Sequence, residues 1–185
     1  MLQIYLKKID EWDLPVLWRK ISETCSEWQK MNDPLNEQPI PSKEDFFAEV
    51  AHNWVEEGNP LLVMQENEII GVTSWSHLSS DYPYNQNELV LDIGLILFDK
   101  EIRGKGYGAE ALSLIVDYLF LMTPYLDGIT ITTWTGNYPM LALIKKFHLP
   151  LYLVKCEAFE LQDNTYERVV YRLNREIWEE NVDEY

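Results

Sequence analysis

The hexapeptide Arg103-Gly104-Lys105-Gly106-Tyr107-Gly108 combines the residue types that bind phosphate. It follows an apolar stretch, residues 90–98, and precedes a helical pattern over residues 109–120. Glycines let main-chain N–H groups approach an anion without interference from Cβ atoms. The next helix adds unsatisfied N–H groups and the positive end of its dipole, and Arg103 and Lys105 add cationic donors. The loop therefore predicts a binding site for a phosphorylated small molecule.

Two nucleotide-binding motifs fit this loop poorly. The run from Gly104 to Ala109 matches Gly-x-Gly-x-x-Ala of the dinucleotide fingerprint. That fingerprint normally opens its domain and needs an acidic residue near the end of the next strand, but strand 129–134 ends without one. A dehydrogenase is therefore the third choice. An NTPase phosphate loop needs Ser or Thr after its lysine, whereas Lys105 is followed by Gly106.

A third pattern fits better. Arg103-x-x-Gly106-x-Gly108, between a strand and a helix, resembles the acyl-CoA pyrophosphate loop of the GNAT superfamily of N-acetyltransferases. Residues 92–98 resemble the fourth strand of that family, and Asn137 with the residues up to Phe147 resembles its asparagine-led helix after the fifth strand. Residues 171–178 are similar to the ribosomal-protein N-acetyltransferase branch.

The alternation of strands and helices predicts an α/β fold with a mixed sheet flanked by helices, and the length predicts a single domain over residues 1–185. The resemblance implies that this domain is an N-acetyltransferase. The resemblance implies that strands 4 and 5 splay apart around acyl-CoA. It also implies that main-chain groups near Leu97 and Phe98 pair with the pantetheine arm and polarise the thioester. The implied cofactor-binding residues are Leu97, Phe98, Arg103, Gly104, Lys105, Gly106, Tyr107, Gly108 and Asn137. The implied cosubstrate is acetyl-CoA.

Composition excludes several classes of protein. A hydrophobic content of 46% predicts a globular chain, and no apolar run reaches the length of a membrane span. The N-terminus lacks the features of a signal peptide, and Cys25 and Cys156 are predicted to be buried thiols, so we expect a cytoplasmic protein. The spacing of histidines and cysteines predicts no metal site.

The net charge of −16 argues against nucleic-acid binding, which needs a basic face. It suits a cationic acceptor drawn into an acidic cleft, although the same charge also serves solubility alone.

The hydrophobic pattern predicts the order of the elements. The predicted strands cover residues 1–9, 61–65, 69–75, 90–98, 129–134, 151–161 and 165–173. The predicted helices cover residues 13–31, 42–57, 109–122 and 137–147, and residues 77–86 form a loop.

Acetyl transfer requires a neutral amine, whereas a free alkylamine with a pKa of about 10 is protonated at pH 7. Asp92 is the first candidate for the base because it is a lone carboxylate in an apolar strand, where desolvation raises the pKa. It lies eleven residues before Arg103, which resembles where histone-acetylating family members place a glutamate base. Glu88 is the second candidate. The alternatives are a purely structural carboxylate, or catalysis by positioning without a protein base.

A general acid is harder to assign. Where many family members carry a tyrosine seven residues after the asparagine, this chain has Ile144, and where some carry a serine it has Met140. Tyr138 is the nearest substitute.

An aromatic and acidic pocket for the acceptor ammonium is the remaining hypothesis. Its candidate residues are Trp75, Asp81, Tyr84 and Trp134, with Tyr82 beside them, although tryptophans equally suit core packing.

These expectations describe an acetyl-CoA-dependent N-acetyltransferase acting on a primary amine. The acceptor is a protein N-terminus or a small cationic amine such as a polyamine or an aminoglycoside. The alternative is a non-catalytic acyl-CoA-binding or sensory module on the same fold. A homodimer is expected from the resemblance alone.

Overall fold

The computed structural model describes residues 4–24, 28–35, 39–77 and 87–182. The chain forms two compact units: Met1–Ser74 with Leu95–Ile115, and Trp75–Gly94 with Val116–Tyr185. Strand β4 and helix α5 each contribute residues to both units. In the described part of the chain, the sheet has the strand order β1-β2-β3-β4-β5-β7-β6.

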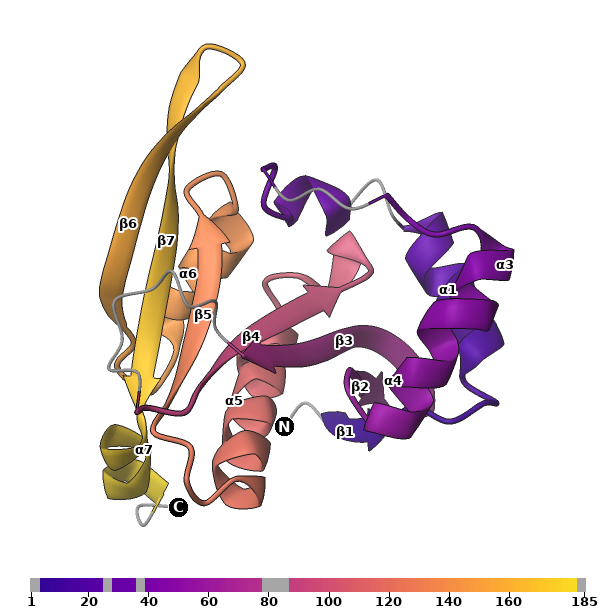
Figure 1. The fold of residues 1–185 in the computed structure, drawn as a ribbon, viewed down its shortest axis with the longest axis horizontal. Helices are drawn as coiled ribbons and strands as arrows, with labels where there is room; N and C mark the ends of the chain where they lie inside the picture. Colours follow the sequence, from indigo (N-terminus) through magenta and orange to yellow (C-terminus); the bar gives the residue numbers. More distant parts are fainter. Residues whose placement is uncertain (1–3, 25–27, 36–38, 78–86, 183–185) are drawn as a thin grey trace. The chain divides into compact units, whose positions relative to one another are not determined.

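The elements follow the predicted order (Figure 1). The strands are β1 (Ile4–Lys8), β2 (Leu61–Gln65), β3 (Glu68–His77), β4 (Val90–Leu97), β5 (Gly128–Trp134), β6 (Tyr152–Leu161) and β7 (Asn164–Asn174). The α-helices are α1 (Leu14–Glu23), α3 (Lys43–Asp45), α4 (Ala51–Glu57), α5 (Tyr107–Met122), α6 (Tyr138–Lys146) and α7 (Arg175–Val182). The described residues also form the 3₁₀ segments η1 (Gln29–Met31) and η3 (Lys100–Ile102) and the π-helical segment η2 (Phe46–Val50).

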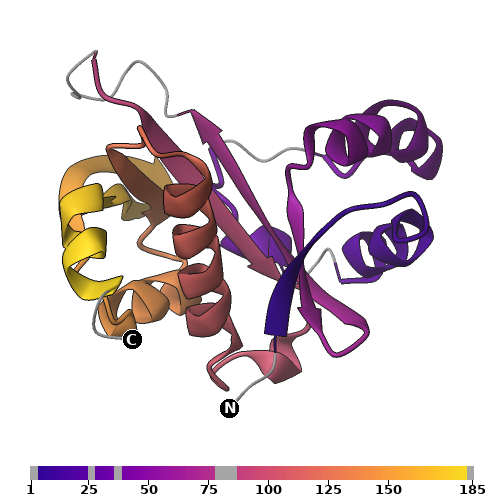
Figure 2. The ribbon, with the colours of Figure 1, turned by 90° about the horizontal axis from the view of Figure 1, so that it is seen from below.

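The first unit packs apolar residues on both faces of β2 and β3. Leu62 and Met64 join a cluster with residues of α1 and α4, whereas Val63 lies in a second cluster with Tyr107 and Ala111 of α5. This is the alternation that a strand produces when both of its faces are covered. Figure 2 shows α1 and α4 side by side next to these strands. The second cluster fixes the start of α5, and with it the loop that precedes this helix.

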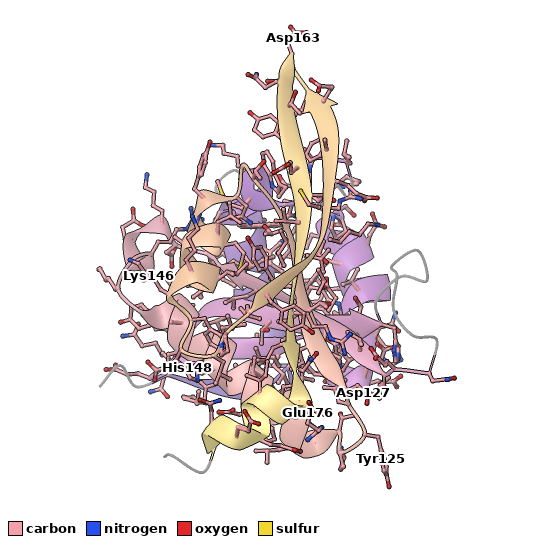
Figure 3. The ribbon with its side chains drawn as sticks, turned by 90° about the vertical axis from the view of Figure 1, so that its left-hand side faces the viewer. Tyr125, Asp127, Lys146, His148, Asp163 and Glu176 are labelled. Carbon is pink, nitrogen blue, oxygen red and sulfur yellow. The ribbon has the colours of Figure 1, made fainter. Side chains whose placement is uncertain are left out.

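The second unit is organised around β5. This strand pairs in parallel with β4 and antiparallel with β7, which in turn pairs antiparallel with β6. Ile129 and Ile131 are buried, while Thr130 and Thr132 alternate with them on the other face. In Figure 3, Asp163 marks the tip of the β6–β7 hairpin, and Asp127 lies at the opposite end of the unit.

Helix α7 caps the C-terminal end of α5 through Arg175. The guanidinium donates to the carbonyl oxygens of Phe120, Thr123 and Leu126 at 2.7–2.9 Å. The carbonyls at a helix C-terminus lack intrahelical partners, so a cation there satisfies them and complements the dipole. The sequence pattern did not predict α7.

Two further expectations were wrong. The helix predicted over residues 13–31 ends at Glu23, where Thr24 is the C-cap with φ −103° and ψ 6°, outside the helical conformation. Cys156 was predicted to be a buried thiol but is exposed, since β6 is an edge strand. Cys25 lies outside the described residues.

The helices of the described residues include none that combines the length and the apolar character needed to cross a membrane.

Candidate active site

Two glycines shape the loop between β4 and α5. Gly104 has φ +75° and Gly106 has φ +98°, a region that residues with a Cβ rarely adopt. The main-chain N–H groups of Ala109 and Glu110 both donate to Gly106 O, at 3.0 and 3.1 Å. The N–H groups at the very start of α5 have no intrahelical acceptor, so they are available to an anion.

The residue that follows this loop is buried, whereas the loop itself is exposed to solvent. The ring of Tyr107 is buried in the cluster with Ala111, whereas Gly104, Lys105 and Gly106 are exposed. Arg103 is partly buried. The side chain of Tyr107 therefore has a packing role, and its contact with a cofactor stays a prediction.

At the end of β4, the main-chain groups of Leu97 and Phe98 point to opposite edges of the strand. The Phe98 N–H donates to Ile70 O at 3.0 Å, and a Cβ on Gly71 would collide with Ile96 O. Main-chain groups of successive strand residues point to opposite edges, so those of Leu97 point away from β3. Because the Phe98 N–H is already bonded and its ring is buried, Leu97 is the stronger candidate for a contact with the thioester arm.

Asp92 lies where β4 and β5 part. The described ladder pairs Val90 with Gly128, Leu91 with Ile129 and Asp92 with Thr130, and it ends there although both strands continue. The hydroxyls of Thr130 and Thr132 both donate to Asp92 Oδ1, at 2.7 and 2.9 Å.

Burial raises the pKa of the Asp92 carboxyl from 3.8 to about 6. Hydrogen bonds from the Thr130 and Thr132 hydroxyls and from the Thr132 N–H oppose this rise, because they stabilise the charged form. The result is a carboxylate that is ionised at pH 7 and is more basic than an ordinary aspartate, as a general base requires.

Glu88, the second base candidate, is engaged in an ion pair. Its Oε2 accepts from Arg172 Nη1 at 2.8 Å, and Arg172 is buried. A Cβ on Gly128 would lie 2.9 Å from Arg172 Nε, so the glycine leaves room for the guanidinium. This geometry gives Glu88 a structural role, and catalysis by Glu88 stays a prediction.

Asn137 is the N-cap of α6. Its Oδ1 accepts from the Met140 N–H at 3.2 Å, and its contact with a cofactor stays a prediction. Tyr138 is 73% exposed and Ile144 is buried. The position where many relatives carry a tyrosine is thus an apolar core position here.

The predicted acceptor residues lie on separate elements. Trp75 packs against Tyr118 of α5 with ring centroids 5.8 Å apart. Trp134 is buried and stands edge-on to Tyr166 of β7 at 5.1 Å. Asp81, Tyr82 and Tyr84 lie outside the described residues. The aromatic pocket therefore stays a prediction.

The sequence over residues 3–149 matches the family model described as an acetyltransferase (GNAT) domain. The chain belongs to the GNAT family. It is therefore an acyltransferase that acts with coenzyme A. Its sheet contains the parallel β4–β5 pair of this fold. No curated protein matches the sequence significantly.

Solved structures share the fold of this GNAT chain at low sequence identity. The aminoglycoside acetyltransferase AAC(6')-Ib in complex with coenzyme A is 19% identical, with a TM-score of 0.67 over 97% of this chain and 99% of that one. RimL, a ribosomal L7/L12 alpha-N-protein acetyltransferase, is 20% identical in its coenzyme A complex, with a TM-score of 0.71 over 94% and 95%. An acetyltransferase from Salmonella typhimurium that modifies the N-terminal serine of L7/L12 is 19% identical, with a TM-score of 0.69 over 94% and 96%.

The sequence interpretation missed three polar residues of this GNAT chain. Thr130 and Thr132 bond to Asp92, and Arg172 binds Glu88. One signal was present: in strand 128–134, threonines at positions 130, 132 and 133 interrupt an otherwise apolar stretch, and the first two lie on one face of the strand. No group of three or more His, Cys, Asp or Glu side chains gathers as a metal site within the described part of the chain.

Proposed function

We propose that this chain transfers the acetyl group of acetyl-CoA to a primary amine, with Asp92 as the general base. The observation that carries the proposal is the placement of Asp92. It is the lone carboxylate of β4, it lies on the last rung of the parallel ladder, and burial raises its pKa to about 6. Perturbed carboxyl groups of this kind mark functional sites.

The proposed reaction conserves atoms and protons. The amine nitrogen attacks the thioester carbonyl carbon, and the C–S bond breaks as the C–N bond becomes an amide. Asp92 accepts the proton that the nitrogen loses, directly or through a water molecule. The CoA sulfur leaves as a thiolate, which is finally protonated to the thiol.

The glycine loop has the complementary role of holding the cosubstrate. We assign the pyrophosphate to the N–H groups of residues 104–108, with Arg103 and Lys105 as cationic donors. The main chain of Leu97 is assigned to the thioester arm, because it points away from β3. An N–H placed at the carbonyl oxygen stabilises the negative charge that develops there.

Thiol release from acetyl-CoA in the presence of a panel of amines tests this proposal. The panel holds polyamines, aminoglycosides and peptides with free N-termini. Amine-dependent release is expected for at least one class. Tight binding of acetyl-CoA with no release for any amine supports the sensory module instead, which the apolar Ile144 at the expected position of the acid favours.

The charge of the chain predicts how the rate depends on salt. With a net charge of −16, a cationic acceptor is drawn toward the protein, so its kcat/KM is expected to fall several-fold as salt rises to about 0.5 M, where the Debye length is only a few Å. Stopped-flow or steady-state rates with a polyamine and with a neutral peptide amine measure this effect. A salt-independent rate for the polyamine would contradict steering and favour a protein N-terminus as the acceptor.

A further inference from the structure

Two threonine side chains bind Asp92, the proposed general base. The proposed function by itself does not explain why both are present. Thr130 and Thr132 are two residues apart on β5, so their side chains lie on one face of the sheet. Both hydroxyls donate to the same oxygen, Asp92 Oδ1. No other side chain of the described residues donates to this carboxylate, and its remaining partner is the Thr132 N–H.

We propose that Thr130 and Thr132 are positioning residues for the transfer reaction: they fix Asp92 Oδ1 against β5 and leave Oδ2 to take the proton of the acceptor amine. This inference rests on the proposed function. It adds which oxygen is the basic one and which residues determine that.

The geometry suits a carboxyl group that gains and loses a proton. A hydroxyl that donates to Oδ1 keeps its acceptor when Oδ2 becomes protonated, because a carboxylic acid retains its carbonyl oxygen as an acceptor. Neither threonine then loses its hydrogen bond during the reaction. Preorganised partners of this kind keep the reorganisation that accompanies proton transfer small.

The charged side chains of the neighbouring strands do not determine the protonation of Asp92. Strands β4 and β5 contain no other charged residue. On β7, Arg172 is the register partner of Thr130 and binds Glu88, and Arg168 is the register partner of Trp134. None of these side chains is among the causes that set the protonation of Asp92, which are burial and the two threonines.

Thr133 supplies the matched control. It is buried like Thr130, lies on the opposite face of β5, and its hydroxyl has no hydrogen-bond partner in the described structure. Replacing this threonine with valine keeps its shape and removes a hydroxyl that bonds to nothing, so fold and activity are expected to persist.

The experiment uses the full chain with T130V, T132V, T130S, T132S and T133V. Valine keeps the shape of threonine without the hydroxyl, and serine keeps the hydroxyl. One readout is the titration of the Asp92 carboxyl carbon by ¹³C NMR, with D92N to assign the signal. The other is the pH dependence of kcat for the best amine in the panel.

Valine at position 130 or 132 is expected to raise the midpoint of the NMR titration and the midpoint of the kcat–pH profile by about one pH unit each. The reason is the loss of a hydrogen bond to the charged form of Asp92. The rate above the midpoint is expected to fall about tenfold as Oδ2 loses its orientation. Serine is expected to restore both, and T133V to change neither.

Two results would overturn the inference: an unchanged NMR midpoint in T130V and T132V, or a shifted NMR midpoint with an unshifted rate profile. Failure of the proposed function looks different. In that case the wild-type chain acetylates no amine in the panel, whatever the NMR titration shows.

Discussion

Replacing Asp92 with Asn is expected to lower kcat for amine acetylation about 100-fold while leaving the affinity for acetyl-CoA nearly unchanged. Asparagine keeps the size of the side chain and an oxygen that accepts from Thr130 and Thr132, but it cannot take a proton. The wild-type rate should fall as the pH drops through about 6, and this limb should vanish in the variant.

The control is Asp163→Asn. Asp163 is exposed at the tip of the β6–β7 hairpin and has a φ of +62°, which asparagine tolerates well (Figure 3). This variant should retain wild-type turnover. Wild-type turnover in Asp92→Asn, with any accepted amine, would show that Asp92 is structural.

Asp92→Asn is also expected to stabilise the fold at neutral pH. In the folded chain the pKa of Asp92 is raised to about 6, so between pH 4 and 6 the native state binds more protons than the unfolded state. Stability from this group is therefore present below pH 4 and lost as the pH rises through 6. A shift of this size corresponds to at most about 3 kcal/mol. Urea unfolding at pH 7.5 and at pH 4 should show a gain for the variant only at the higher pH.

Gly106→Val is expected to weaken acetyl-CoA binding more than tenfold, which requires a loss of only about 1.4 kcal/mol. Gly106 has φ +98°, so a β-branched residue forces the loop out of the conformation that presents its N–H groups. Isothermal titration with acetyl-CoA measures the affinity directly.

Gly58→Val separates loop distortion from general instability. Gly58 ends α4 with φ +64°, so valine is strained there as well, and its Cβ would lie 3.7 Å from the Lys8 side chain, an ordinary contact. That variant should be less stable yet bind acetyl-CoA normally. Unchanged affinity in a folded Gly106→Val chain would refute the assignment of the pyrophosphate to this loop.

The sequence predicted what depends on residues close together in the chain. The glycine loop could be predicted because its glycines and cations lie within six positions. The β2–β3 hairpin could be predicted because two apolar runs flank a short turn. The partners of Asp92 and Glu88 were not predictable in this way. They lie 38 to 84 positions away and meet only through the register of β4, β5 and β7.

The packing partners of aromatic residues could not be predicted from the sequence either. Trp75 and Trp134 lie near the C-terminal ends of β3 and β5. Composition does not predict which face of the sheet a ring takes, and each ring packs against a different element. Helix α1 illustrates a similar limit: apolar spacing continues beyond Glu23, but the backbone leaves the helical conformation at Thr24, where φ is −103° and ψ is 6°.

A product balance for the wild-type chain tests directly whether it transfers acetyl groups to amines. Acetyl-CoA at saturating concentration is mixed with an accepted amine, and both the CoA thiol and the acetylated amine are quantified by mass spectrometry. One acetylated amine is expected for each CoA released, with no release in the absence of the amine. Release of CoA without an acetylated amine, or tight binding of acetyl-CoA with no release for any amine, would contradict this function.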